Sequence, residues 1–248
     1  MNVMLADIEQ DALSTAVEQL RGFGPRVHGL ICDVTDPASM DQAANKTFET
    51  FGNVHVLCNN AGVAGGSGID NISLETWRWV IDVNVMGVVH GVHSFLPRMR
   101  AHGEGGHIVN TASMAGLESG LGFSPYATSK FAVVAMSEGL ALQLQSLGIG
   151  VTVLCPGFVR THIGASARNR PERYGPAPVL DPASAEGKLA AESARLQRAG
   201  IDPSDVAKCT VRAIRNNELY VFTHPEMRDD VRKRFSAIEA AMDEAALR

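Results

Sequence analysis

The sequence predicts one α/β domain, residues 1–248, whose core is a doubly wound parallel sheet. Two observations lead to this fold class. Short apolar runs alternate with longer helical patterns along the whole chain, as in successive β-α-β units. Hydrophobic residues make up 45% of the 248 residues, which is enough for one large core, and no repeat or linker indicates a second domain.

The expected elements follow one another in a regular order. Apolar runs predict strands at 3–6, 27–31, 54–58, 107–110, 151–154 and 219–222. The stretches between them predict helices at about 9–21, 37–51, 73–100, 125–147, 183–199, 203–216 and 225–246. Asp36-Pro37 and Ser124-Pro125 each place an N-cap side chain before a first-turn proline, and Ser73 marks a third, weaker helix start.

Composition and charge argue against several kinds of partner. The formal net charge is −5 at pH 7 without a cluster of basic residues, so neither nucleic acid nor a membrane is expected to bind. No run of about 18 apolar residues predicts a membrane span, and no signal-peptide pattern is visible. A cytoplasmic location is therefore expected. Histidines and cysteines do not show metal-site spacing, so the sequence predicts no metal.

The segment 160–202 interrupts the alternation of strands and helices. It is rich in Ala, Arg, Pro and Gly. A long insertion between a strand and the next regular helix is usually a lid or a binding loop. We expect this segment to be a substrate-binding loop within the single domain.

Ser113, Tyr126 and Lys130 form the strongest chemical pattern. Tyr126 and Lys130 are four residues apart in a predicted helix and therefore share a face. Tyrosine titrates near 10, but a neighbouring ammonium and the positive end of the helix that begins near Ser124 both favour its phenolate. Tyr126 could then exchange a proton with an alcohol or carbonyl oxygen held by the Ser113 hydroxyl. Taken alone, however, the Tyr–Lys pair fits a surface tyrosine beside a solvated lysine better.

Three further motifs reverse that preference. Asn59-Asn60-Ala61-Gly62 follows the strand at 54–58, Asn84 lies within the helix at 73–100, and Pro156-Gly157-Phe158-Val159-Arg160-Thr161 follows the strand at 151–154. Together with Ser113, Tyr126 and Lys130, these motifs resemble those of the classical short-chain dehydrogenases/reductases, in the same order and over essentially the whole chain. The resemblance implies a Rossmann-like fold. It also implies an enzyme that interconverts a secondary alcohol and a ketone by hydride transfer with NAD(H), with Tyr126 as acid or base.

The same resemblance implies roles for the neighbouring residues. Asn84 would shape its helix and hold a water in a proton relay to Lys130, which would also bind the nicotinamide ribose. Asn60, Ala61 and Gly62 would line the cofactor at the carboxyl end of a strand, where ligands of open α/β sheets bind. Further cofactor contacts would come from Asp33 and Val34 at the adenine ring, from Val159 and Thr161 at the carboxamide, and from Ile8, Pro156 and Gly157. The implied substrate contacts are Ser113, Met114, Tyr126 and Phe158.

Asp7 bears on the choice of dinucleotide. It ends the first apolar run of the chain. A carboxylate at this position accepts hydrogen bonds from the adenosine ribose hydroxyls and repels a 2′-phosphate, so NAD is predicted in preference to NADP. The alternative is that Asp7 is the N-cap of a helix over residues 8–21.

The resembled family begins with a strand, a glycine-rich TGxxxGxG turn and a helix, which have no counterpart here. No GxGxxG pattern occurs, and the chain begins at what corresponds to the family's second strand. Since that turn holds the pyrophosphate, we expect a fold with its first βα unit missing, an N-terminally truncated chain that binds NAD poorly. The alternative to an enzyme is a catalytically silent protein of the same fold, acting as a scaffold or a ligand sensor.

The segment at 220–227 points to a class of substrate. It is similar to the tail of dehydrogenases that act on bulky aromatic secondary alcohols, such as benzylic Cα-dehydrogenases. We expect a small-molecule alcohol or ketone as substrate, with bulky or aromatic ones as candidates. The family resemblance also implies a homodimer or homotetramer that packs through the helices at 73–100 and 125–147.

Overall fold

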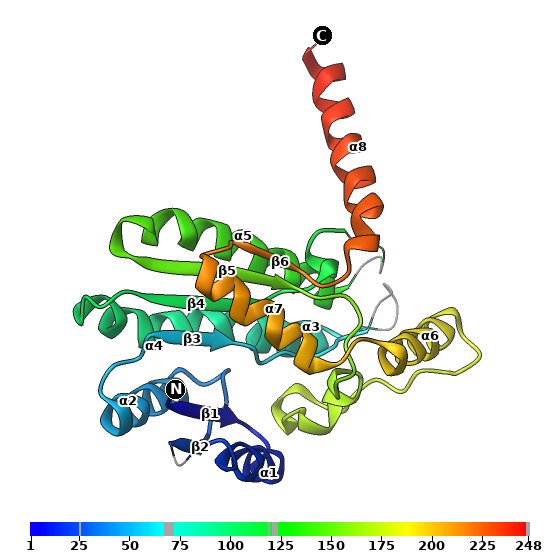
Figure 1. The fold of residues 1–248 in the computed structure, drawn as a ribbon. Helices are drawn as coiled ribbons and strands as arrows, with labels where there is room; N and C mark the ends of the chain where they lie inside the picture. Colours follow the sequence, from blue (N-terminus) through cyan, green and yellow to red (C-terminus); the bar gives the residue numbers. More distant parts are fainter. Residues whose placement is uncertain (25, 67–71, 119, 121–123, 247–248) are drawn as a thin grey trace.

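The computed structural model describes residues 1–24, 26–66, 72–118, 120 and 124–246. Figure 1 shows a parallel sheet between helices, with a long carboxyl-terminal helix projecting from the body. The strands are β1 (Val3–Asp7), β2 (Val27–Ile31), β3 (Val56–Asn59), β4 (Gly106–Thr111), β5 (Ile149–Cys155) and β6 (Tyr220–Phe222). The α-helices are α1 (Gln10–Arg21), α2 (Pro37–Phe51), α3 (Leu74–Ile81), α4 (Gly87–Ala101), α5 (Pro125–Leu144), α6 (Ala185–Ala199), α7 (Pro203–Asn216) and α8 (Arg228–Ala246).

Every strand pair in the sheet is parallel, which confirms the predicted fold class. β1 pairs with β2, and the other strands pair in the order β3-β4-β5-β6. Among the described residues β1 shares no ladder with β3, so the sheet has two parts. The expectation of a missing first βα unit stays a prediction.

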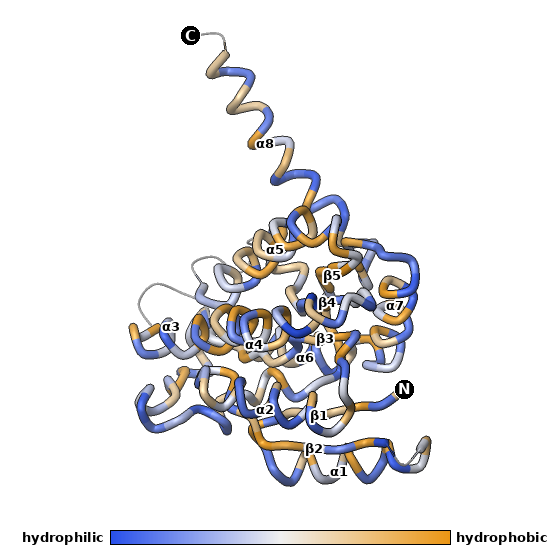
Figure 2. Tube along the Cα trace, turned by 90° about the vertical axis from the view of Figure 1, so that its left-hand side faces the viewer, coloured by the Kyte–Doolittle hydropathy of each residue, from blue (hydrophilic) through white to orange (hydrophobic). Residues whose placement is uncertain are grey.

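Helices cover both faces of the larger part of the sheet. Along β4, Ile108 packs in one cluster with Phe95 of α4, whereas its neighbour Val109 packs in another with Ala213 of α7. Successive side chains of a strand point to opposite faces, so α4 and α7 lie on opposite sides, as Figure 1 also shows. Figure 2 shows the apolar segments gathered where these layers meet, and α8 alternating between polar and apolar residues outside them.

Local capping chemistry sets the helix starts that the sequence predicts. The Asp36 side chain accepts a hydrogen bond from the Ala38 backbone N–H over 3.0 Å, and Pro37 is the first residue of α2. Ser124 caps α5 in the same way, accepting from the Ala127 N–H over 3.4 Å. Ser73 caps α3, which confirms the weaker signal as well. These caps satisfy donors that the first helical turn leaves without an intrahelical partner.

The long helix predicted at 73–100 is not a uniform α-helix. Between α3 and α4 it contains a π-helical turn, Asp82–Met86, that includes Asn84. The continuous helix Leu74–Ala101 is long and apolar enough to span a membrane by length and composition alone, which is weak evidence because core helices pass the same test. Val80 and Met99 in it are fully buried within the protein, and this packing accounts for the apolar composition.

Side-chain contacts tie the segment 160–202 to the amino-terminal part of the chain. After a short loop it forms 3-10 turns at Ile163–Asn169 and Glu172–Tyr174, and then α6, close to the predicted helix. The Arg168 Nε donates to Glu9 over 3.2 Å, just before α1. Arg173 forms an ion pair of 3.1 Å with Asp33, just after β2. The segment therefore lies over the carboxyl ends of β1 and β2.

Candidate active site

Tyr126 and Lys130 lie one turn apart near the start of α5, as their spacing predicts. The Lys130 Nζ lies 5.6 Å from the centroid of the Tyr126 ring. It also donates a hydrogen bond of 2.8 Å to the backbone carbonyl of Thr111, the last residue of β4. Lys130 is only 2% exposed, so its ammonium is enclosed by protein with a fixed direction.

Burial sets the charge states of this pair. It lowers the pKa of Lys130 to about 8, so the side chain is mostly an ammonium at pH 7. Burial also raises the pKa of Tyr126, and the nearby Ser113 hydroxyl acts in the opposite direction. Tyr126 is therefore a phenol in the resting protein, and the neighbouring Lys130 ammonium and Ser113 hydroxyl would stabilise its phenolate.

Ser113 stands between β4 and the segment that follows β5. Its Oγ accepts a hydrogen bond from the Ala115 N–H over 3.1 Å and so caps the 3-10 turn Met114–Gly116. The same Oγ donates to the Pro156 carbonyl over 3.3 Å. A hydroxyl has one proton and can rotate, so this long hydrogen bond leaves Ser113 able to turn toward the Tyr126 oxygen or toward a ligand oxygen.

Asn84 is a buried connector rather than a surface group. Its side-chain amide donates to the Val63 carbonyl and accepts from the Val63 N–H, over 3.0 and 2.8 Å. It also donates to the Ser129 hydroxyl over 3.0 Å. An ideal Cβ on Gly62 would lie 3.5 Å from both the Asn84 Oδ1 and the Lys130 Nζ, which shows that both groups converge on Gly62. The structure thus places the four predicted catalytic residues close together, either in direct contact or through an adjacent residue such as Gly62.

Asp7 and Asn60 lie at the carboxyl ends of β1 and β3. The Asp7 carboxylate is exposed, and its Oδ1 accepts from the Glu9 N–H over 2.8 Å. The N-cap of α1 is Glu9, so the alternative interpretation of Asp7 as the capping residue is wrong by two positions. Asn60 is also exposed and accepts from the Thr111 hydroxyl over 3.0 Å, which joins the ends of β3 and β4. Ala61 is exposed and Gly62 is half-buried.

Asp33 and Val34 follow β2, whereas Ile8 follows β1. Burial alone would raise the pKa of Asp33, but hydrogen bonds from Thr35 and Arg173 outweigh it, and the pKa is lowered. The Val34 carbonyl lies 2.8 Å from the Nδ1 of His90 on α4. Ile8 is 41% exposed. These three residues border the same edge of the sheet as Asp7.

The segment after β5 contacts two residues that the sequence did not single out as site residues. The Gly157 N–H donates to the Nδ1 of His224 over 3.1 Å, and an ideal Cβ on Gly157 would lie 2.6 Å from the His224 Cγ. The Gln197 amide of α6 donates to the Val159 carbonyl over 3.2 Å and to the Thr161 hydroxyl over 3.0 Å. Both contacts join residues distant in sequence, so no local spacing could predict them.

The two further substrate residues expected from the sequence lie in different surroundings. Phe158 is 36% exposed. Met114 is 4% exposed and packs in a hydrophobic cluster with Val133 and Val134 of α5. The 3-10 turn that Ser113 caps directs the Met114 side chain into the core, and its expected contact with substrate stays a prediction.

Comparisons with known proteins identify the family. Residues 1–172 match the family model described as short chain dehydrogenase. The chain belongs to the short-chain dehydrogenase family. It is 31% identical over 237 residues to the C alpha-dehydrogenase of Sphingobium sp. (strain NBRC 103272 / SYK-6), covering 95% of this chain and 76% of that protein.

Solved structures of the short-chain dehydrogenase family share the fold closely. A short chain dehydrogenase/reductase from Burkholderia phymatum in complex with NAD superposes with a TM-score of 0.92 at 40% identity, covering 97% of this chain and 86% of that chain. A variant of the actinorhodin polyketide ketoreductase with NADPH has a TM-score of 0.73 at 27% identity, covering 90% and 85% of the two chains. Both dinucleotides therefore occur among the structural relatives.

The donor and acceptor groups of this short-chain dehydrogenase fit a nicotinamide dinucleotide. Asp7 offers an exposed carboxylate for ribose hydroxyls at the end of β1. Lys130 offers a buried ammonium beside Tyr126 at the end of β4. Ligands of open α/β sheets bind outside the carboxyl ends of the strands, and these groups lie along that edge.

Proposed function

We propose that the protein is an NAD-dependent oxidoreductase that interconverts a secondary alcohol and a ketone. The observation that carries the proposal is the buried Lys130 ammonium, fixed by the Thr111 carbonyl and lying beside Tyr126. The chemistry that a bound dinucleotide would supply is hydride transfer from the alcohol carbon or to the ketone carbon. The relatives are dehydrogenases and reductases by name, which agrees with this class of reaction.

Tyr126 supplies the acid–base part of the reaction. In ketone reduction its phenol donates a proton to the carbonyl oxygen, and in alcohol oxidation its phenolate accepts the hydroxyl proton. The Lys130 ammonium and the start of α5 stabilise the phenolate. Ser113 donates a hydrogen bond to the same substrate oxygen and fixes it beside Tyr126. Asn84 holds the Val63 backbone and Ser129, and thereby positions the helix turn that bears Lys130.

Asp7 supports NAD rather than NADP as the cofactor. Its exposed carboxylate follows β1, where it would accept from the adenosine ribose hydroxyls and repel a 2′-phosphate. Asn60, Ala61 and Gly62 would line the same cofactor at the end of β3. Asp33, Val34 and Ile8 would border its adenosine, and Pro156, Gly157, Val159 and Thr161 its nicotinamide.

The relatives support a bulky or aromatic substrate. A C alpha-dehydrogenase is among them, and Phe158 presents an exposed aromatic ring next to the segment 160–202, which would act as the lid. We further propose a homodimer or homotetramer. Met86, Val89 and Leu142 expose apolar side chains on the long helices that would pack between subunits.

The test is turnover by the Tyr126→Phe variant. The wild-type chain should oxidise one or more of a panel of bulky aromatic secondary alcohols, with a higher kcat/KM for NAD than for NADP. Tyr126→Phe should reduce kcat by at least ~100-fold, the range of general acid–base catalysis, while the calorimetric Kd for NAD changes little.

Tyr220→Phe is the matched control, because Tyr220 is exposed on β6 outside the site. It should keep full activity. Residual turnover of Tyr126→Phe near the wild-type level would refute the assigned acid–base role. A wild-type chain that binds ligands from the panel but turns none over would instead favour the scaffold or ligand sensor.

A further inference from the structure

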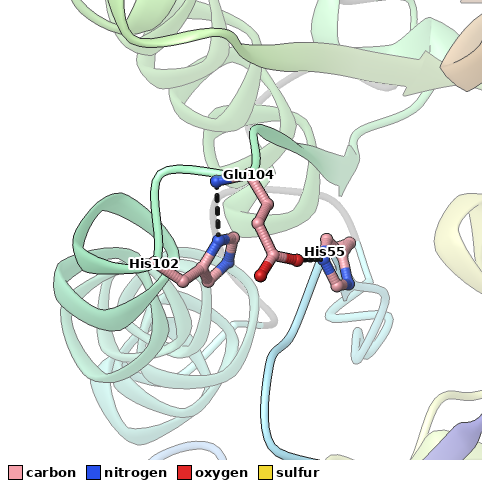
Figure 3. A group of neighbouring side chains, drawn as sticks. All are labelled: His55, His102 and Glu104. Carbon is pink, nitrogen blue, oxygen red and sulfur yellow. Dashed lines mark hydrogen bonds and ion pairs between the residues drawn. The ribbon is translucent and has the colours of Figure 1, made fainter.

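Two histidines and a glutamate gather at the opposite end of the sheet from Tyr126. His55 directly precedes β3, His102 caps the carboxyl end of α4, and Glu104 lies in the turn before β4. Figure 3 shows Glu104 between the two imidazole rings. Asn60 and Ser113, by contrast, follow the carboxyl ends of the same two strands. The cluster is therefore separated from the candidate active site by the length of the strands.

The three side chains have the spacing of a small-ion site. One ligand atom from each lies within 4.8 Å of the other two. The His55 Nε2 and the Glu104 Oε2 are already 2.6 Å apart, and the two imidazole centroids are 5.1 Å apart. Zinc binds imidazole nitrogen and carboxylate oxygen at about 2.0–2.2 Å, so modest rotations of these side chains would bring all three atoms onto one ion.

Neighbouring groups orient two of the three ligands. The Nε2 of His102 lies 3.0 Å from the Val54 carbonyl oxygen, which can accept a hydrogen bond but cannot donate one. This contact selects the tautomer with Nε2–H, so the Nδ1 lone pair is on the side of the cluster, where it accepts a hydrogen bond of 3.1 Å from the Glu104 backbone N–H that the ion would displace. The Asn53 amide donates to the second oxygen of Glu104 over 2.7 Å. Metal-binding histidines and carboxylates are held by such outer hydrogen bonds in known sites.

We propose that His55, His102 and Glu104 bind one Zn²⁺ ion, with water as the fourth ligand. Two imidazoles and one carboxylate are a common set for zinc with one open position. The His55 and Glu104 side chains are 51% and 53% exposed, so an ion can reach them without unfolding. The bound ion would join the chain before β3 to the turn before β4 and hold the amino ends of the two strands together.

Zn²⁺ would displace the hydrogen bond between His55 and Glu104. The His55 Nε2 lies 2.6 Å from the Glu104 Oε2, and because an ionised carboxylate only accepts hydrogen bonds, this nitrogen donates. When Zn²⁺ takes the place of that proton on Nε2, a charged imidazole would release the proton to solvent and a neutral imidazole would bear it on Nδ1. Glu104 would exchange its hydrogen bond for a bond to the ion. Affinity should therefore rise with pH over the range in which histidine loses its proton.

Calorimetric titration of the chelator-treated 248-residue chain with ZnCl₂ tests the proposal directly. One site per chain is expected, with a Kd that tightens between pH 6 and pH 8. Zn²⁺ should raise the Tm, because an ion that binds only the folded state stabilises it. Co²⁺ in place of Zn²⁺ should give the visible absorption of a low-coordinate site. None of these readouts depends on the proposed oxidoreductase activity.

Single substitutions locate the ion. His55→Ala and Glu104→Gln should each weaken zinc binding by at least ~10-fold, whereas His93→Ala, an exposed histidine on α4, should leave it unchanged. Both ligand residues are largely exposed, so the variants should fold, which their Tm without zinc checks. Zinc affinity unaffected by His55→Ala and Glu104→Gln, or the lack of saturable binding by the wild-type chain, would overturn the proposal. The His55–Glu104 contact would then be an ion pair only.

Discussion

Replacing Lys130 by methionine should separate stability from activity. Lys130 is 2% exposed, and burial lowers its pKa from the ordinary 10.5 to about 8. At ~1.4 kcal/mol per pH unit, this gap means that holding the ammonium inside the folded protein costs about 3 kcal/mol. The cost is fully present below pH 8, where both folded and unfolded chains bear the proton. Methionine retains most of the buried stem and bears no charge.

The sign of the pH dependence follows from the direction of this shift. Between pH 8 and 10.5 the unfolded chain binds the Lys130 proton and the folded chain does not. The free energy of unfolding of the wild type should therefore rise relative to that of Lys130→Met, by about 3 kcal/mol over this range. Other buried groups, such as Cys155 with its pKa raised to about 12, act in the opposite direction above pH 9. Groups that do not interact with Lys130 cancel in the difference, whereas Cys155, whose pKa the Lys130 ammonium lowers, does not cancel fully above pH 9.

At pH 7 the Lys130→Met variant no longer bears the free-energy cost of a buried ammonium, but it loses one hydrogen bond. The Thr111 carbonyl would lose its 2.8 Å contact with the Lys130 Nζ, which costs about 1–3 kcal/mol. Lys130→Met should thus be as stable as the wild type or more stable by up to about 2 kcal/mol at pH 7, and inactive.

Urea unfolding at pH 7, 8, 9 and 10 measures the difference between the two proteins. Lys188→Met, which removes an exposed lysine of α6, is the control and should change the free energy of unfolding by less than about 0.5 kcal/mol at every pH. A difference between wild type and Lys130→Met that does not vary with pH would refute the reasoning from burial.

Three further predictions concern neighbouring contacts. Gly157→Ala should destabilise the protein by about 1–3 kcal/mol, because its Cβ would lie 2.6 Å from the His224 Cγ; adding His224→Ala should remove most of that cost in a double-mutant cycle of urea unfolding. Asn84→Ala should cost about 3 kcal/mol, since it leaves the buried Val63 N–H and carbonyl without their side-chain partner, and a loss below 1 kcal/mol would contradict that role. Gln197→Ala should lower the KM for NAD, because the Gln197 amide occupies the groups proposed to bind the nicotinamide carboxamide. An unchanged KM would show that the Gln197 amide does not compete with the carboxamide for these groups.

Signals encoded locally in the chain predicted most of the fold. The caps Asp36 and Ser124 begin their helices where the sequence places them, and β2 has the predicted bounds. The π-helical turn Asp82–Met86 was not predicted, because π-helical turns are rare and no capping or turn residue marks them in the sequence. Local sequence patterns indicate helix caps and the buried face of a helix, but they do not reveal a π-helical turn.

Fewer features of the candidate site than of the fold could be predicted from the sequence. The spacing of Tyr126 and Lys130 predicted that they share a helix face. The Thr111 carbonyl that fixes Lys130 could not be predicted in this way, because it lies on another element. His224 and Gln197 reach the segment after β5 from distant parts of the chain. The burial of Met114 depends on how the 3-10 turn after Ser113 packs against α5. Such contacts arise only from the tertiary arrangement.

The ion pairs that tie the segment 160–202 to the ends of β1 and β2 imply that this segment, the proposed lid, is sensitive to ionic strength. Arg168 with Glu9 and Arg173 with Asp33 are partly exposed. Exposed ion pairs contribute little, about 0–1 kcal/mol each, and salt screens them over about 10 Å at 0.1 M. The proposed lid is thus held in part by weak contacts. Raising the salt concentration should shift it toward an open state and speed the release of a bound ligand.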